Sequence, residues 1–204
     1  MKYYYHPGSP NCRKVSAVIE MLGVDAKYEF VDLPKGKQAQ PEFRAVNPSG
    51  MVPVLVDGAT TVFESNCIVI HLCEKTGSEL WPEADRHEIL QWMFWEQSHF
   101  MYATGIVFFQ KLLKPLLGQE PDETRVTEAV AKFRRHAQAL DDRLKGREWL
   151  VGDAMTLADL AVAAQLTYAK ATDLPMDEFP DIQRWYAAIE ELPAWKATHP
   201  ALAG

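Results

Sequence analysis

The 204-residue sequence contains only three cysteines, Cys12, Cys67 and Cys73. Their number is odd, and their spacing matches neither a zinc site nor a disulfide framework. We therefore expect reduced thiols and no bound metal.

Long apolar runs and clusters of positive charge are also missing. No apolar segment approaches the roughly 20 residues that a membrane-spanning helix needs, and Met1 leads into a short aromatic run rather than a signal peptide. Lys and Arg are scattered, and the formal net charge is -7 at pH 7. These features disfavour a membrane or nucleic-acid partner and predict a cytoplasmic protein.

The first eighty residues alternate between strand and helix patterns. Lys2–Tyr5 is an aromatic strand pattern that a Pro-Gly turn closes, and apolar residues then recur at helical spacing from Pro10 to Gly23. Residues 28–32 form a second β-rich run. The opening therefore predicts a βαβ unit with parallel strands and a right-handed crossover.

The next segments predict a short helix at 41–45, an antiparallel hairpin and a further helix. Residues 53–57 and Thr60–Phe63 are β-rich and separated by a two-residue turn, and a helical pattern with Ser65 as its expected N-cap follows, up to Gly77.

After residue 78 no strand pattern appears in the sequence. We expect a linker at 79–86 and helices at about 87–117, 122–144, 157–171, 181–190 and 194–199. The predicted organisation is an α/β domain at 1–78 followed by an all-α domain at 87–204.

Ser9-Pro10-Asn11-Cys12 lies where the first strand gives way to the first helix. Unpaired N–H groups and the helix dipole stabilise a thiolate at such a junction, which redox cysteines of thioredoxin-like proteins occupy. Ser9 and Cys12 have C-x-x-C spacing with serine first. Ser9 cannot perform dithiol chemistry, but its hydroxyl can donate a hydrogen bond to the thiolate of a ligand. Taken alone, the local pattern favours a plain helix N-cap at Ser9 over a ligand-binding role.

Several segments together resemble the cytosolic glutathione transferases over the whole chain. The opening Tyr4-Tyr5-His6-Pro7-Gly8-Ser9-Pro10-Asn11-Cys12-Arg13-Lys14-Val15 is most similar to the serine-type delta and theta classes and related bacterial proteins. Val52-Pro53-Val54-Leu55, Phe63-Glu64-Ser65 and Gly152-Asp153-Ala154-Met155-Thr156-Leu157-Ala158-Asp159 match further family segments in order and spacing. The resemblance implies a thioredoxin-like α/β domain followed by a helical-bundle domain.

The resemblance assigns roles to individual residues. Ser9 would donate a hydrogen bond to the glutathione sulfur, and the Val52 backbone would pair with the cysteinyl amide of the tripeptide as an added strand. The peptide bond before Pro53 would be cis.

The γ-glutamyl end of glutathione would be held by three consecutive residues. The resemblance places Glu64 against the ammonium group, and the Ser65 hydroxyl and Asn66 backbone N–H against the carboxylate.

The glycine end departs from the family pattern. Many relatives carry a basic residue near position 50 or 51, where this chain has Gly50 and Met51, and delta and theta members often carry histidine in place of Gln38. Gln38 and Met51 remain candidate glutathione contacts.

The second domain has weaker candidates. Tyr102 and Phe109, on an aromatic and sulfur-rich helix face, are candidates for lining an electrophile pocket, although core and dimer packing explain most of such a face. Thr156 and Asp159 predict a capping box, which stabilises a helix and is not a ligand site.

Five other reactive or charged residues of the first domain favour structural roles. We interpret His6 as part of a turn, Arg13 as a local cap or pairing partner, and Cys12 as buried and inert. Cys67, like Cys73, is expected to face the core.

The resemblance therefore implies a detoxifying transferase that conjugates glutathione, as co-substrate and without a cofactor, to small hydrophobic electrophiles. A homodimer is implied by the resemblance. Two alternatives stay open: a glutathione-dependent disulfide reductase or peroxidase, and a non-catalytic interaction module on the same fold.

Overall fold

The computed structural model describes residues 1–200 and divides the chain into two compact units. Unit 1 contains Met1–Trp81 together with the segment that begins at Glu191, and unit 2 contains Pro82–Glu190. The segment after Glu191 thus groups with the α/β unit, although the sequence-based boundaries assign it to the helical domain. The last four residues of that predicted domain lie outside the described part.

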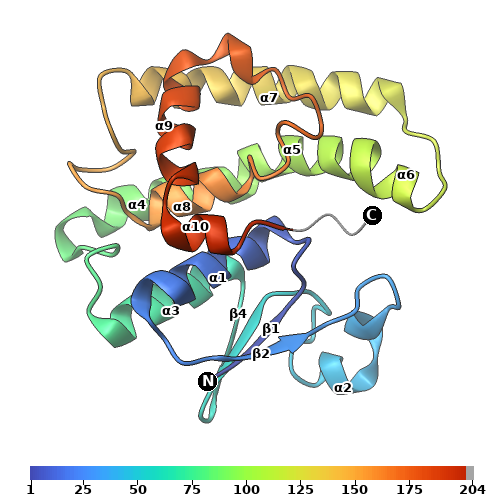
Figure 1. Cartoon of the computed structure of the whole chain (residues 1–204), viewed down its shortest axis with the longest axis vertical. Coiled ribbons are helices and arrows are strands. Elements are labelled where there is room, and N and C mark those ends of the chain that lie inside the picture. Colours follow the sequence, from blue (N-terminus) through green and yellow to red (C-terminus); the bar gives the residue numbers. More distant parts are fainter. Residues whose placement is uncertain (201–204) are drawn as a thin grey trace. The chain divides into compact units, whose positions relative to one another are not determined.

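Unit 1 is built on a four-stranded sheet (Figure 1). The strand order is β2-β1-β3-β4. β1 pairs with β2 in parallel, as predicted for the βαβ unit, and β3 is antiparallel to both β1 and β4. The strands are β1 (Lys2–Tyr5), β2 (Lys27–Phe30), β3 (Val54–Asp57) and β4 (Thr60–Phe63).

Consecutive residues of β1 point to opposite faces of this sheet, because side chains alternate along a strand. Tyr3 is fully buried, and its hydroxyl donates to the Cys12 carbonyl of α1 (Pro10–Leu22) at 2.8 Å. Tyr4 faces the other way, with its ring 5.8 Å from that of Phe43 in α2 (Pro41–Arg44). One face is thus covered by α1 and α3 (Ser65–Thr76), and α2 lies across the strands from them (Figure 1).

Left-handed glycines end the two long helices of unit 1. Gly23 follows α1 with φ +60° and Gly77 follows α3 with φ +66°, which only glycine adopts without strain. Both ends agree with the prediction. The start of α3 differs, because Ser65 is the first helical residue and Glu64 occupies the N-cap position.

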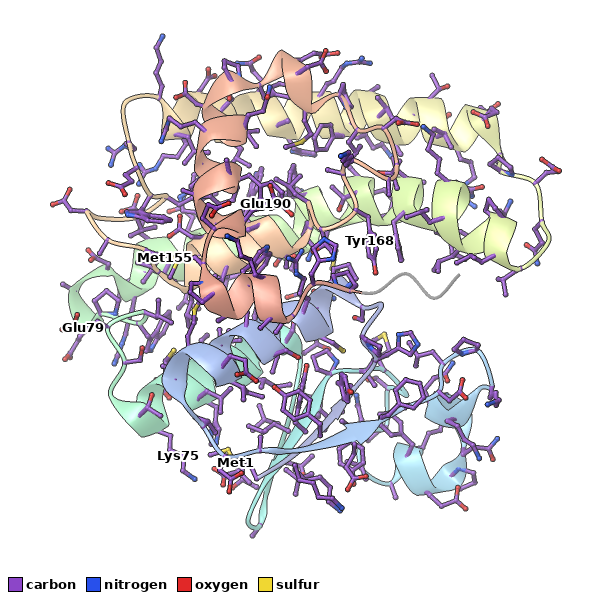
Figure 2. All side chains as sticks on the ribbon, in the orientation of Figure 1. Met1, Lys75, Glu79, Met155, Tyr168 and Glu190 are labelled. Atoms are coloured by element: carbon purple, nitrogen blue, oxygen red, sulfur yellow. The ribbon has the colours of Figure 1, made fainter. Side chains whose placement is uncertain are left out.

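Charged groups hold α3 to the end of the sheet at which β3 ends and β4 begins. Asp57, at the end of β3, accepts from Lys75 and lies 3.0 Å from His71 Nε2. The Lys75 ammonium, followed by His71, holds the pKa of the Asp57 carboxyl below its usual range. Figure 2 labels Lys75 and Met1, both at this end of the unit.

Arg13 and Cys67 do not behave as predicted. The Arg13 guanidinium lies 4.3 Å from the Trp195 ring and donates to the Trp195 carbonyl at 3.1 Å, so it joins α1 to α10 (Pro193–Ala197) rather than pairing locally. Cys67 is exposed, and only Cys73 faces the core. Residue 67 lies two positions along α3 from the core-facing Ser65, on the helix side that points outward.

Unit 2 is helical throughout its described secondary structure. Its first helical stretch runs through two π-helical turns at the positions where one long helix is expected. The segments are η2 (Glu83–Asp85), α4 (Arg86–Trp95), η3 (Glu96–Phe100), α5 (Met101–Phe108), η4 (Phe109–Leu113) and α6 (Lys114–Leu116).

The remaining helices of unit 2 pack around a buried core. α7 (Glu123–Leu144) lies along α5, and α9 (Pro180–Glu190) contacts both α7 and α8 (Leu157–Ala164) (Figure 1). Phe133 of α7 is fully buried between the rings of Phe100 and Phe179. The predicted helix at 157–171 is shorter in the structure, because turns replace it after Ala164. No described helix is long and apolar enough to cross a bilayer.

Candidate functional site

The sheet register brings the predicted glutathione residues to one edge of unit 1. Tyr4 pairs with Val54, and Val54 pairs with Phe63, so the end of β1, the start of β3 and the end of β4 coincide. Segments that are far apart in sequence therefore leave the sheet side by side: the Ser9 turn, Val52-Pro53 and Glu64-Ser65-Asn66. The end of β2 lies at the same edge, because Phe30 pairs with Tyr5.

Ser9 is the N-cap of α1. Its Oγ accepts a hydrogen bond from the Cys12 N–H at 3.3 Å, and its backbone has the extended conformation of a cap. A hydroxyl can accept and donate at once. The cap interaction therefore uses a lone pair and leaves the hydroxyl proton to donate, so the capping role and a thiolate-binding role are compatible.

The turn before Ser9 depends on neutral His6. The Gly8 N–H donates to His6 Nδ1 at 3.1 Å, and the Ser9 N–H donates to the His6 carbonyl at 3.0 Å. Burial lowers the pKa of His6, and the opposing effect of Asp32 is smaller. These contacts support the structural interpretation, since Nδ1 can accept only in the unprotonated ring.

We expect unfolding free energy to fall on acidification through His6. A folded-state pKa below the unfolded value of about 6.5 means that the contribution is complete above that pH and is lost as pH falls through the folded value. Urea unfolding at pH 8 and pH 5.5 should show a steeper loss in the wild type than in His6→Gln. Equal slopes would contradict this role of His6.

Cys12 is unsuited to nucleophilic chemistry. Its side chain is fully buried, and burial raises the pKa of its thiol to about 11. At neutral pH the thiolate that would attack a disulfide is therefore negligible. The prediction that Cys12 is buried is confirmed.

The segment before β3 has the predicted backbone feature. The Val52–Pro53 peptide bond is cis. The Met51 carbonyl accepts from Asn47 Nδ2 at 2.7 Å, whereas the Met51 side chain is exposed. Val52 packs on the cluster of Val31, Phe43 and Val54.

Glu64 has an unusual backbone conformation between β4 and α3. Its φ is +66°, one of two positive values among the described non-glycine residues, and such strain of about 1–3 kcal/mol concentrates at ligand sites. The next two residues, Ser65 and Asn66, are buried in the first turn of α3. The first α-helical hydrogen bond of α3 is donated by the Ile68 N–H to the Glu64 carbonyl, so the N–H groups of Ser65 and Asn66 lie before the regular i→i−4 bonds of the helix.

The structure places a cation near Gly50 that the sequence analysis missed. A Cβ at Gly50 would lie 3.0 Å from the Gln38 carbonyl and 3.5 Å from the Arg44 guanidinium, and Gly50 has φ +65°. A basic side chain at position 50 would therefore be strained and crowded. Gln38 Oε1 is a buried acceptor without a hydrogen-bond partner in the described part. The sequence feature that could have indicated Arg44 is its position shortly before the Asn47 turn, which leads to Gly50.

Tyr102 and Phe109 belong to unit 2 and are both partly exposed, at 56% and 42%. The Lys132 ammonium lies 5.0 Å from the Tyr102 ring centre. Their neighbour Phe108 instead stacks on Tyr168, which Figure 2 labels. Both candidates are thus accessible aromatic surfaces, whereas much of the predicted aromatic face is packed.

Two family models and a full-length relative decide what this arrangement belongs to. The model described as glutathione S-transferase, N-terminal domain, matches residues 4–80, and the C-terminal domain model of the same family matches residues 98–193. Glutathione S-transferase 3 of Zea mays is 33% identical over 99% of this chain and 94% of its own length. The chain belongs to the glutathione S-transferase family.

Solved structures agree with this membership. Glutathione transferase F7 of Populus trichocarpa superposes with a TM-score of 0.90 at 29% identity, covering 97% of this chain and 96% of that one. A family member from Pseudomonas fluorescens, with two glutathione molecules bound, gives 0.88 at 27% identity, covering 98% and 92%. The fold is the glutathione transferase fold, and this transferase uses glutathione as its co-substrate.

These relatives include plant enzymes, and none of the three is named as a delta or theta member. The comparisons therefore establish the family and do not support the predicted delta or theta class. In the described part, no three His, Cys, Asp or Glu side chains gather in a way that could hold a metal ion.

Proposed function

We propose that this transferase activates glutathione by the serine-type mechanism, with Ser9 donating a hydrogen bond to the glutathione thiolate. The observation that carries the proposal is the Ser9 hydroxyl at the N-terminus of α1, where it accepts from the Cys12 N–H and keeps its own proton to donate. The buried, high-pKa Cys12 argues against a disulfide reductase that uses this cysteine.

The required stabilisation is modest. A thiol with a pKa of about 8.5 becomes mostly thiolate at neutral pH when its pKa falls by ~2 units, which corresponds to about 2.7 kcal/mol. One charge-assisted hydrogen bond of about 1.5–3 kcal/mol, together with the α1 terminus, supplies this amount. Ser9 is too weakly basic to take the proton, which leaves to solvent. The thiolate then attacks the electrophilic carbon and forms the carbon–sulfur bond. Either a leaving group departs with the electron pair of its bond to that carbon, or a double bond opens and its displaced electron pair takes a proton from solvent.

The rest of glutathione would extend along the same sheet edge. Val52 would pair with the cysteinyl amide, and Glu64 would face the γ-glutamyl ammonium. Ser65 and Asn66 would hold the γ-glutamyl carboxylate with groups of the α3 N-terminus.

Arg44 is our candidate for the glycine carboxylate. Its guanidinium lies beside Gly50 and close to Gln38, in the region where relatives carry a basic side chain. The exposed Met51 would contact the same end of the tripeptide through its backbone or side chain.

Unit 2 would supply the pocket for a small hydrophobic electrophile, with Tyr102 and Phe109 as candidate lining residues. The accessible aromatic side chains of these two residues support this pocket.

We further propose that the transferase is of the serine type, forms a homodimer and is located in the cytoplasm. The family membership supports this part of the proposal.

Glutathione should raise the melting temperature of the transferase. A ligand that binds only the native state adds about 2.7 kcal/mol at a hundredfold excess over its dissociation constant, or about 5 °C or more for a chain of this size. Thermal melts with millimolar reduced, oxidised and S-alkylated glutathione measure the effect. No shift with any of the three would contradict the proposed glutathione site and favour a non-catalytic interaction module.

A further inference from the structure

His6 bonds the turn that presents Ser9 through its side chain as well as its backbone. The Gly8 N–H donates to His6 Nδ1 at 3.1 Å, and the Ser9 N–H donates to the His6 carbonyl at 3.0 Å. The turn leads directly into the N-cap of α1, where Ser9 Oγ accepts from the Cys12 N–H at 3.3 Å. The position of the Ser9 hydroxyl therefore depends on the bond between Gly8 and the imidazole.

The imidazole of His6 is oriented by an aromatic neighbour. Its ring centre lies 5.6 Å from that of Phe30 at the end of β2, and the two ring planes are 32° apart. Phe30 pairs with Tyr5, the residue before His6, so the sheet register brings the two rings together. This contact limits rotation of the imidazole and keeps Nδ1 directed at the Gly8 N–H.

We propose that His6 is a positioning residue for Ser9, whose neutral imidazole holds the Ser9 turn in the geometry that activates glutathione and whose protonation in acid opens that turn. This inference rests on the proposed function, because it concerns the hydroxyl that would bind the glutathione thiolate. In this role His6 acts through the turn and takes no proton from glutathione.

Protonation of His6 is incompatible with the observed turn, because it changes Nδ1 from an acceptor to a donor. The N–H groups of Gly8 and of the imidazolium would then face each other at hydrogen-bond distance, so the turn must rearrange. A displacement of about 1 Å near a reacting group can lower turnover by about a hundredfold. The bond to Gly8 thus couples the protonation of His6 to turnover.

Neighbouring elements set the pH at which this change occurs. Burial lowers the pKa of His6, and Asp32, which follows β2 and is paired with Lys35 at 2.8 Å, opposes burial to a smaller degree. On α1, Cys12 interacts with the His6 backbone, and its thiol stays protonated because burial raises its pKa to about 11. The Phe30 ring carries no charge. The imidazole is therefore neutral at pH 7, and we expect the change below the usual value of about 6.5.

The test is the pH dependence of turnover at saturating glutathione, with chlorodinitrobenzene as the electrophile, in the wild type, His6→Asn and His6→Leu. The asparagine Oδ1 replaces Nδ1 as an acceptor and does not titrate, whereas leucine offers no acceptor. At pH 7.5 we expect His6→Leu to lose about tenfold or more in turnover and His6→Asn to stay within about threefold of the wild type.

The decisive quantity is the turnover of the wild type divided by that of His6→Asn, because the titration of the glutathione thiol is common to both. This ratio should be constant above pH 7 and fall by about tenfold per pH unit once His6 is protonated. His71→Asn is the matched control, since His71 lies 3.0 Å from Asp57 at the opposite end of the sheet, and its ratio to the wild type should stay constant.

Three kinetic results would overturn the inference. A ratio of wild type to His6→Asn that stays constant in acid would show that His6 does not control turnover. A ratio that rises in acid would show that the imidazolium stabilises the thiolate directly. Equal losses in His6→Asn and His6→Leu at pH 7.5 would show that the acceptor atom is not what the turn requires.

NMR of the wild type tests the same point if neither variant of His6 folds. The amide resonances of Gly8 and Ser9 should shift with the same midpoint as the His6 imidazole, and amides that do not follow this titration would overturn the inference. A wild type that binds glutathione without lowering the pKa of its thiol would instead overturn the proposed function.

Discussion

Replacing Ser9 with alanine should lower turnover about ten- to a hundredfold, since the lost charge-assisted bond is worth roughly 1.5–3 kcal/mol in the transition state. Glutathione affinity should change little, because the carboxylates and backbone of the tripeptide would be held by other residues. The pKa of the bound thiol, followed by thiolate absorbance against pH, should rise in Ser9→Ala. Steady-state kinetics and this titration measure the two effects together.

Two control variants distinguish the loss of thiolate activation from the loss of the helix N-cap. Ser9→Gly removes the same hydroxyl, but glycine is a tolerated N-cap, so it should lose as much turnover as Ser9→Ala with a smaller loss of stability. Cys12→Ala should keep turnover near the wild-type value, because the Cys12 thiol is buried and protonated. A neutral Ser9→Ala combined with an inactive Cys12→Ala would show that the assigned mechanism is wrong.

Asp159→Ala should be the most destabilising single change, at about 3–5 kcal/mol. The Asp159 carboxylate is fully buried and accepts from the Leu150 N–H, the Thr156 N–H and the Trp185 indole, each at 2.9 Å. Its removal leaves these donors without their acceptor in a region closed to water. Chemical denaturation of the full chain measures the loss.

Asp122→Ala is the matched control for this change. Asp122 also caps a helix, accepting from the Arg125 N–H at 3.1 Å, but it is exposed. Its loss should cost about 1 kcal/mol, the usual value for an N-cap. Similar losses in the two variants would show that Asp159 acts only as a cap and that its bonds to Leu150 and Trp185 contribute little.

Local patterns predicted much of unit 1. The strands at Lys2–Tyr5 and Thr60–Phe63 have the expected bounds, since an aromatic or β-branched run between turns is a strong strand signal. Gly23 and Gly77 end helices as predicted, because their positive φ values favour glycine. The Thr156–Asp159 capping box was likewise readable from spacing and is present.

Helix details in unit 2 were less predictable. The two π-helical turns, Glu96–Phe100 and Phe109–Leu113, interrupt what the sequence presents as one continuous helix. A π-turn inserts a residue without changing local propensity, so a periodicity argument does not detect it. Periodicity also misses the early end of α8 at Ala164, because the apolar pattern continues through the buried turns that follow it.

The sequence by itself determined the family and the order of the elements, because both depend on short motifs at set spacing. The residues that would meet glutathione were predicted from the resemblance that the same motifs carry. Only the tertiary structure placed Ser9, Pro53 and Glu64 at one sheet edge, since strand register joins segments that are distant in sequence. It alone brought the Arg44 guanidinium beside Gly50 and enclosed Lys14 against Asn66. Burial and the choice of partner for a long charged side chain depend on packing between elements, and no local pattern encodes them.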